Sequence, residues 1–395
     1  MKVLILHQHF NTPQKGGALR SYYLAKALVD QGIQTIVITG NNEAQQRVEH
    51  VDGIEVHYLP IAYLNKFGFY KRSGSFLKYI FQSVNTASKF KDIDVCYAIS
   101  VPLTIGLAAL WIRQRLGIRY IFEVGDLWPD APIQVGVIKN YFFKQFLYSL
   151  ERIIYQQAAS VVALSPMIKA AIEKKTPGKR VHLLPNMADT DFYHPEEKDV
   201  QLEEKYSVKG KFVVSYMGAV GFANGLDYYL ECARNSQKAA LPIHFFLCGD
   251  GAMANRLRES AKRIQLNNFT FIPFTNRAGI RELMNITDAS FICYKALPIL
   301  ETGSPNKYFD GLAAGKLIVT NFGGWIKEEI EQRGCGFFTD PKHPTDFTKK
   351  IQPYLTDSAL LKQSQQKSRA LAEEKYSREK LSIAFADIIR SEKRS

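Results

Sequence analysis

The chain has 395 residues, 46% of them hydrophobic, which is enough to build two domain cores. No apolar run approaches the roughly 20 residues that a membrane-spanning helix requires, and the apolar stretch after Met1 is too short for a signal-peptide core, so we expect a cytoplasmic location. The net charge of +13 does not identify the partner, because nucleic acid, anionic lipid and phosphorylated small molecules all attract a basic protein.

The first half of the chain alternates between short apolar runs and helix-length amphipathic segments. The segments at 17–32 and 103–117 are predicted helices that end at Gly32 and Gly117, since glycine is preferred at a helix C-terminus. This alternation is typical of a parallel sheet covered by helices on both faces. The predicted strands are 2–7, 34–39, 54–59, 94–99, 119–124, 160–165 and 181–185.

A polar stretch interrupts this pattern, which then starts again. Six further strands are predicted at 212–218, 243–249, 269–274, 289–295, 316–321 and 336–340, followed by helix only. We therefore predict an α/β protein with two Rossmann-like, doubly wound domains that face a cleft. The expected boundaries are a first domain at 1–190, a linker at 191–210, a second domain at 211–375, and a C-terminal helix at 376–395 that could pack back on the first domain.

Ligands of such sheets bind beyond the carboxyl ends of the strands, so the loops after the strands are the candidate sites. The first loop, "HQHFNTPQKGGALR", opens a helix with Gly16 and Gly17, where an anion could approach bare N–H groups; a tight turn without a ligand is the alternative. Arg20 follows and could face the cleft or pair on the surface. The loop does not match G-x-G-x-x-G, so a dinucleotide fingerprint is not supported.

Other strand-end loops carry polar candidates. Asp126 in "FEVGDLWPD" could act as a base, bind a sugar hydroxyl, or cap the following turn. Glycine-rich turns at Gly218 and Gly249 follow two strands of the second domain, and Arg277 follows a third as a possible phosphate contact or surface charge.

The segment "ETGSPNKYFDGLAAGK", 301–316, carries the strongest chemical signal. Ser304 is a preferred N-cap and Pro305 suits the first helical position. Free N–H groups at this helix start, together with Lys307, would make an anion site suited to a diphosphate. Glu301 and Asp310 could accept hydrogen bonds from sugar hydroxyls.

These segments resemble the retaining glycosyltransferases of family 4, which have the GT-B fold, over nearly the whole chain. "HQHFNTPQKGGALRSYYLAKALVDQG" is similar to the family's first loop and helix, and "EVGDLWPD" resembles the "RDLWP" segment of a subgroup that assembles bacterial surface polysaccharides. "LLPNMADTDFYHP" is similar to the segment leading into the linker, "YMGAVGFANGLD" to the first turn of the nucleotide domain, and "SPNKYFDGLAAGK" to the E-x7-E region.

Three departures from the family pattern matter. With Asp310 as the second acid, the E-x7-E spacing falls on Thr302 and places Glu301 one residue too early. Ala219 and Asn224 stand where many relatives have the arginine and lysine that clamp the diphosphate. Gly125 stands where relatives often have histidine or arginine, which leaves Asp126 as the nearest polar candidate.

The resemblance implies transfer of a hexose or N-acetylated amino sugar from a nucleoside-diphosphate donor, expected to be UDP-linked, with retention at the anomeric carbon. The acceptor would be lipid-linked or a polysaccharide, in O-antigen or capsule assembly. Catalytic roles fall to Asp126, Glu301 and Lys307. The donor contacts expected are Gly16, Gly17, Gly218, Gly249, Arg277, Ser304, Pro305, Asn306, Lys307 and Asp310.

We expect no metal and no cofactor. The five cysteines are widely spaced and mostly lie in apolar runs, which is typical of reduced core thiols. "DID" at 92–94 and "DTD" at 189–191 mimic a metal motif, but one leads into a strand and the other enters the linker. Paired acids without a third ligand are a poor magnesium site.

Two segments, 63–91 and 139–157, mix basic residues with aromatic ones. Such segments can lie on an anionic bilayer, or their aromatic residues can face a core while the lysines are solvated. We expect contact with the inner face of the cytoplasmic membrane, and with the acceptor, from Arg20, Phe67, Phe69, Tyr70, Lys71 and Arg72.

Three other functions stay open at this point. A nucleotide-sugar 2-epimerase has the same fold and would form product without an acceptor. A peripheral membrane scaffold with a degenerate site is compatible with the missing arginine and lysine. A basic nucleic-acid-binding protein is a further class, although no RNP-like, zinc-finger or helix-turn-helix signature is present.

Overall fold

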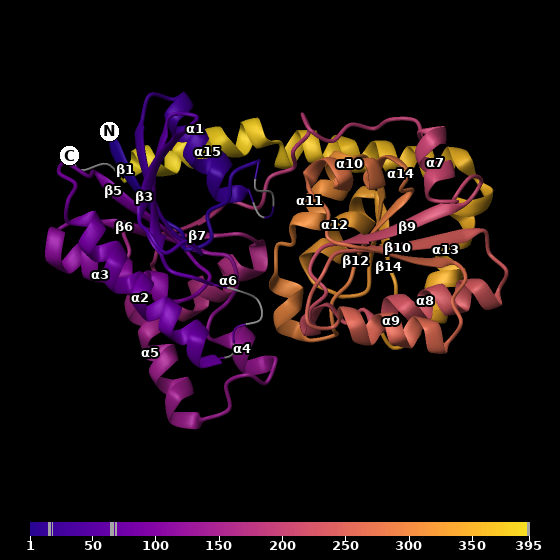
Figure 1. The fold of residues 1–395 in the computed structure, drawn as a ribbon, viewed down its shortest axis with the longest axis horizontal. Coiled ribbons are helices and arrows are strands. Elements are labelled where there is room, and N and C mark those ends of the chain that lie inside the picture. The colour runs from indigo at the N-terminus through magenta and orange to yellow at the C-terminus, as the bar shows by residue number, and fades with distance from the viewer. Residues whose placement is uncertain (15–16, 18, 64–66, 68, 393–395) are drawn as a thin grey trace. The chain divides into compact units, whose positions relative to one another are not determined.

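The computed structural model describes residues 1–14, 17, 19–63, 67 and 69–392, apart from the side chains of Phe69 and Tyr70. The chain divides into two compact units (Figure 1). The first unit comprises Met1–Pro185, Thr302–Ser304 and Glu379–Ser395, and the second comprises Asn186–Glu301 and Pro305–Arg378.

The first unit is built on an eight-stranded sheet with the order β3-β4-β2-β1-β5-β6-β7-β8. All neighbouring strands are parallel except β3, which runs antiparallel to β4. The central strands are buried along their whole length, as expected for a sheet covered on both faces. The strands are β1 (Lys2–Leu6), β2 (Gln34–Asn41), β3 (Arg47–Val51), β4 (Ile54–Pro60), β5 (Val95–Ile99), β6 (Tyr120–Val124), β7 (Ser160–Ala163) and β8 (Val181–Leu183).

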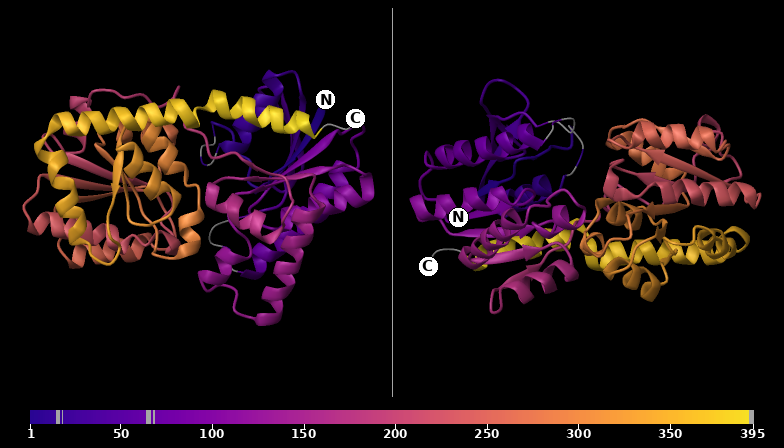
Figure 2. Two further views of the ribbon diagram at one scale, coloured as in Figure 1. Left: turned by 180° about the vertical axis from the view of Figure 1, so that it is seen from behind. Right: turned by 90° about the horizontal axis from the view of Figure 1, so that it is seen from below.

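Helices cover both faces of this sheet (Figure 2). They are α1 (Arg20–Asp30), α2 (Phe69–Ala87), α3 (Thr104–Leu116), α4 (Asp130–Gln134), α5 (Tyr141–Gln157) and α6 (Pro166–Lys175). The C-terminal helix α15 (Arg378–Ser391) also packs here, with the ring of Phe385 centred 4.8 Å from that of Tyr97. Glu392, which is buried, accepts hydrogen bonds from Arg119 and Arg180 at 3.1 and 3.3 Å.

The second unit has a six-stranded parallel sheet with the order β11-β10-β9-β12-β13-β14. Its core is rich in aromatic residues, and the ring of Tyr229 packs edge-on against Phe245 and Phe291. The strands are β9 (Phe212–Met217), β10 (Ile243–Cys248), β11 (Phe269–Ile272), β12 (Ala289–Ile292), β13 (Leu317–Thr320) and β14 (Gly336–Phe338). The helices are α7 (Val200–Lys205), α8 (Asp227–Lys238), α9 (Ala254–Arg263), α10 (Arg277–Asn285), α11 (Asn306–Ala313), α12 (Trp325–Arg333), α13 (Thr345–Thr356) and α14 (Ser358–Leu371), with shorter turns at Phe222–Asn224, Pro298–Thr302 and Ala372–Tyr376.

Two details differ from the sequence prediction. Strand β3 was not predicted because "RVEHV" is mostly polar, which suits its place at the sheet edge. The segment expected as a linker packs on the second unit instead: Val208 is fully buried against Val213 and Phe246, and Lys198 Nζ lies 2.6 Å from Asp288 Oδ2. Among the helices that the structure describes, none is long and apolar enough to cross a bilayer.

Candidate functional site

A polar site forms at the carboxyl edge of the second sheet, where strands β9, β12 and β13 end and helix α11 begins. Lys307, in the first turn of α11, reaches back under the turn that follows β9. Its Nζ donates to the hydroxyl of Tyr216 at 3.0 Å and lies 4.3 Å from the centre of that ring and 5.4 Å from that of Tyr294. The ammonium group is therefore held between two aromatic rings, which attract a cation.

Lys307 is protonated at neutral pH, but its pKa lies only slightly above that pH. Burial lowers the pKa of its ammonium group to about 8, and the nearby Cys293 and Asp310 offset only part of this effect. No carboxylate forms an ion pair with Lys307 among the described residues. A cation that is desolvated and unpaired in this way is suited to bind an anion.

Asp310 lies one helical turn further along α11. The pKa of its carboxyl group is raised to about 7, mainly by burial; Arg277 lowers it, Asp189 raises it and Lys307 lowers it by smaller amounts. Asp310 therefore changes charge near neutral pH. A half-buried carboxylate at this position can accept hydrogen bonds from hydroxyl groups such as those of a ribose.

Arg277 was predicted as a phosphate contact or a surface charge, but its guanidinium is held by other residues of the second unit. Its guanidinium forms an ion pair with Asp189 and stacks on the ring of Phe192, 3.7 Å from the ring centre. Asp189 is 6% exposed and also accepts a hydrogen bond from Arg378 at 2.9 Å. The "DTD" segment is thus neutralised by arginines, and Arg277 acts on Asp310 through its charge.

The glycine turns after β9 and β10 are joined backbone to backbone. The N–H of Gly218 donates to the carbonyl of Cys248 at 2.9 Å, and a Cβ added to Gly249 would clash with the Gly218 carbonyl oxygen. Both glycines have positive φ, 145° and 147° respectively. A Cβ at Gly218 would approach Lys307 Cε to 3.2 Å, so these two glycines allow Lys307 to lie directly against the turn.

The start of α11 differs slightly from the prediction. Pro305, not Ser304, is the N-cap residue, and helix α11 begins at Asn306, which is exposed. The extended φ/ψ of Pro305 suits a cap, although proline offers no capping side chain. The first N–H groups of α11 lie next to Lys307 in sequence and point out of the helix end, as in any helix.

Glu301 lies beside the glycine turn that precedes α12. It lies in the short 3-10 turn Pro298–Thr302, and its carboxylate packs against Gly323, where a Cβ would come within 3.1 Å of it. Gly323 precedes α12 at the end of strand β13. Glu301 is therefore placed at the loop that follows β13.

In the first unit, Asp126 lies exposed on the loop after β6. Partial desolvation by the surrounding protein raises the pKa of its carboxyl group above the usual range. Gly17 adopts a φ of 86°, which fits the glycine predicted in the first loop, and Gly16 lies outside the described residues.

Arg20 faces the interior of the first unit. Its Nε and one terminal nitrogen donate to the two carboxylate oxygens of Glu123 at 3.0 and 2.8 Å, and the guanidinium also donates to the carbonyls of Leu184 and Pro185. Tyr97 donates to the same carboxylate. Only 10% of the Arg20 side chain is exposed, so its charge is already used within the fold.

The candidates expected at a membrane or acceptor lie around the start of α2. Lys71 Nζ lies 5.8 Å from the centre of the Phe67 ring, and the Arg72 guanidinium lies 5.8 Å from that of Tyr63. The side chains of Phe69 and Tyr70 are outside the described part of the chain.

The sequence prediction missed Tyr216, Tyr294 and Asn321. Tyr216 is fully buried within strand β9, where a tyrosine also suits a core. Asn321 donates to the carbonyl of Tyr294 and accepts from its N–H, both at 3.0 Å, which fixes the ends of β12 and β13 beside Lys307. Tyr294 in "CYK" and Asn321 in "VTN" directly follow strands, and this position was the available signal for them; Tyr216 lies inside a strand and gave no such signal.

The Tyr216→Phe substitution should lower kcat about tenfold, because the charged Lys307 donor loses its hydroxyl acceptor, and a hydrogen bond of this kind is worth about 1.5–3 kcal/mol. Tyr229→Phe is the matched control, since this buried hydroxyl contacts the carbonyls of Val214 and Phe246, away from Lys307. Steady-state kinetics should leave the control unchanged. Equal losses in both variants would mean that Tyr216 acts only through stability.

No group of three histidine, cysteine or acidic side chains that could hold a metal is found in the part of the chain that the structure describes. All five cysteines are buried and unbonded to one another.

Two family models match the chain and together span most of it. The "Glycosyl transferase 4-like domain" matches residues 15–187, and "Glycosyl transferases group 1" matches residues 197–374. The chain is 25% identical over 281 residues to "Probable glycosyltransferase WbjE" of Pseudomonas aeruginosa, which is 68% of either chain. It is 22% identical over 243 residues to the alpha-D-kanosaminyltransferase of Streptomyces kanamyceticus, covering 58% of this chain and 59% of that one.

Solved structures share the fold across nearly the full length. Sucrose-phosphate synthase from Thermosynechococcus elongatus superposes with a TM-score of 0.79 at 13% identity, covering 99% of this chain and 98% of that one. Anabaena HepE in complex with UDP gives a TM-score of 0.70 at 18% identity, covering 99% and 100%. The two family matches and this shared architecture show that the chain belongs to the glycosyltransferases of the GT-B fold.

Proposed function

We propose that this glycosyltransferase moves a hexose or an N-acetylated amino sugar from a UDP-linked donor, with retention at the anomeric carbon. The observation that carries the proposal is the unpaired, half-buried ammonium of Lys307 beside the Gly218 turn. A diphosphate leaving group needs compensating positive charge, and Lys307 takes the place of the arginine and lysine that positions 219 and 224 lack.

In this mechanism the charge that develops on the departing diphosphate is stabilised by Lys307 and by the N–H groups at the start of α11. Asp310 holds the donor by accepting hydrogen bonds from ribose hydroxyls. The leaving diphosphate takes the proton of the acceptor hydroxyl, so that no protein nucleophile and no metal are required. Asp126 of the first unit is assigned to the acceptor side, where it holds the acceptor by a hydrogen bond to a hydroxyl group while the diphosphate takes the proton.

Three of the similar proteins support parts of this proposal. HepE was solved with UDP and with UDP-glucose, the kanosaminyltransferase is named for an amino sugar, and WaaG, which has a TM-score of 0.70 at 16% identity, is named for lipopolysaccharide biosynthesis. We accordingly propose a lipid-linked or polysaccharide acceptor in bacterial O-antigen or capsule assembly, met at the inner face of the cytoplasmic membrane.

The Asp310→Asn substitution should weaken UDP binding about tenfold at pH 8, because a carboxylate that accepts ribose hydrogen bonds is replaced by a neutral amide. Titration calorimetry measures this directly. Asp387→Asn, at an exposed position on α15, is the control and should bind UDP like the parent.

A screen of nucleotide-sugar donors separates the proposed transferase from the alternatives. Nucleotide sugars are tested for protection against thermal unfolding and for product formation with and without acceptor. Epimerised product without an acceptor would identify a 2-epimerase. Absence of binding to every nucleoside diphosphate would contradict the proposed donor site.

A further inference from the structure

Helix α5 of the first unit carries an apolar stripe that faces solvent. Phe142, Phe146 and Ile153 are 81, 60 and 46% exposed, and their spacing of four and seven residues places them on one face of the helix. Tyr141 and Phe143 extend this surface at the beginning of the helix, with 66 and 43% exposure. We call these five residues the α5 stripe.

The α5 stripe is separate from the face of α5 that packs on the core of the first unit. The opposite face of α5 is already buried through Leu147, Ile154 and Tyr155. It packs tightly on α3, where a Cβ added to Gly106 would come within 2.7 Å of Ile154. The exposed aromatic residues therefore exceed what the fold of this unit needs, and a surface of this kind marks an interaction site.

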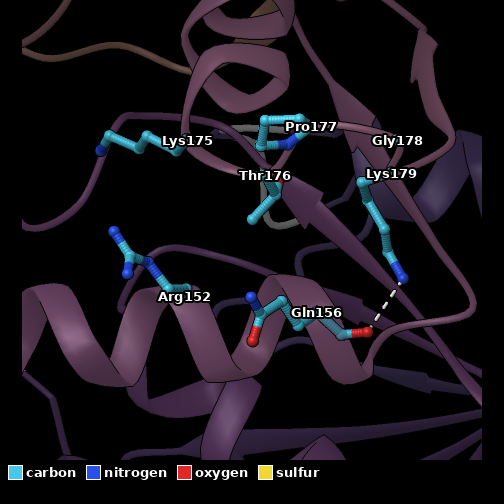
Figure 3. Close-up of a pocket in the computed structure, with 7 residues that line it drawn as sticks. All are labelled: Arg152, Gln156, Lys175, Thr176, Pro177, Gly178 and Lys179. Atoms are coloured by element: carbon cyan, nitrogen blue, oxygen red, sulfur yellow. Dashed lines mark hydrogen bonds between the residues drawn. The ribbon is translucent and has the colours of Figure 1, made fainter.

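The part of the chain that carries the stripe is rich in positive charge. Residues 137–180, which contain α5 and α6, include eight lysines and arginines but only two acids. A pocket of about 520 Å³ is lined by α5, the end of α6 and the turn that follows it. Figure 3 shows Arg152 pointing from α5 toward Lys175. Lys179 lines the other end of this pocket and donates to the Gln156 carbonyl at 3.1 Å.

The basic residues of this pocket differ in whether they form ion pairs. Lys175 is paired with Asp130 and Glu151, whereas Arg152 forms no ion pair within the described residues and is exposed. Arg152 lies one residue before Ile153 of the stripe. A phosphate group at Arg152 would thus lie at the polar border of the aromatic surface.

We propose that the α5 stripe is a docking surface for an anionic lipid bilayer, with the aromatic residues inserted at the interface and Arg152 at the level of the phosphate headgroups. Apolar and aromatic residues on one helix face, bordered by basic side chains, are the features that interfacial helices share. A second copy of the chain is disfavoured as the occupant, because pairing two stripes would bring two strongly basic segments together.

This inference deepens the proposed function, since a lipid-linked acceptor would be met at such a surface, but its test does not depend on catalysis. The full-length protein is floated with vesicles of phosphatidylcholine alone or with added phosphatidylglycerol. Binding is expected only to the anionic vesicles and should fall as salt is raised.

Substitution of the stripe gives the decisive comparison. Phe142→Ser combined with Phe146→Ser should lower the vesicle partition coefficient at least about tenfold, because two aromatic side chains no longer leave water. Phe274→Ser, at a 70% exposed position of the second unit, is the matched control and should bind like the parent. Arg152→Gln should weaken binding to anionic vesicles and reduce its dependence on salt.

Three results would overturn the proposal. These are parent protein that does not float with anionic vesicles at low salt, a double variant that floats like the parent, and a lipid-free dimer that the double variant abolishes in sedimentation. UDP binding measured on the same samples should be equal in parent and double variant. A parent protein that does not bind UDP would contradict the proposed donor site but would not affect the conclusion about bilayer binding.

Discussion

The Lys307→Met substitution is expected to lower the kcat for sugar transfer by about 100- to 1000-fold. The reason is that Lys307 supplies the unpaired positive charge beside the glycine turn, and the loss of one electrostatic stabiliser of a leaving group typically costs this much. Methionine is unbranched and one atom shorter than lysine, so it removes the ammonium group and keeps most of the apolar stem. Steady-state kinetics with saturating donor and acceptor make the measurement.

The control for this experiment is Lys362→Met, which removes one exposed charge from helix α14. It should leave kcat unchanged, so that a general effect of net charge is separated from the effect at the site. Full activity of the Lys307 variant would show that the donor diphosphate is neutralised elsewhere. The site assignment would then have to be abandoned.

The dependence of kcat/KM on pH follows from the same two residues. Asp310, with a pKa near 7, must be charged to accept hydrogen bonds, so activity should fall as pH decreases through about 7. Lys307, with a pKa near 8, must be protonated, so activity should also fall as pH rises through about 8. The acidic limb should disappear in Asp310→Asn, and a limb that persists there would belong to another group.

The Arg20→Met substitution should destabilise the first unit by about 3–5 kcal/mol, because it leaves the buried carboxylate of Glu123 without its cation. The carbonyls of Leu184 and Pro185 would lose their donor as well. The free energy of unfolding, measured in urea by tryptophan fluorescence and circular dichroism, tests this. UDP binding by the second unit should be retained at temperatures at which the variant stays folded.

A double-mutant cycle with Glu123→Gln identifies the cause of this destabilisation. The double variant should be less destabilised than the sum of the two single changes, because removal of both charges leaves no unpaired ion in the interior. Additive effects would show that the pair is not coupled. A loss of acceptor binding without any loss of stability would instead assign Arg20 to the acceptor, as first predicted from its position in the sequence.

Most of the fold could be predicted from the alternation of apolar runs and amphipathic helices. The six strands of the second sheet were all predicted, since each is short, apolar and bounded by loops. Strand β3 was missed because an edge strand contacts only one neighbour and tolerates polar residues. The association of Asn186–Lys211 with the second unit was not predicted, because single buried residues such as Val208 carry no periodic signal.

The site was predictable in its residue types more than in its contacts. Lys307 and Asp310 were singled out because they follow a helix start at the end of a strand, and the structure places them at one sheet edge. Tyr216 was not, because a buried tyrosine in a strand looks like core until its hydroxyl is seen to accept from Lys307. Arg20 was placed near the ligand, although its partner Glu123 lies 103 residues away in sequence, beyond any local pattern.

The C-terminal segment has a consequence for how the protein is made on the ribosome. Glu379–Ser395 belongs to the first unit, where Phe385 meets Tyr97 and Glu392 meets Arg119. The N-terminal unit therefore cannot complete its core until residues 379–392 have been synthesised, although domains generally fold in the order of their synthesis. The second unit, whose segments end at Arg378, can complete its fold first. Until helix α15 has been synthesised, the apolar surface around Tyr97 is not covered by Phe385.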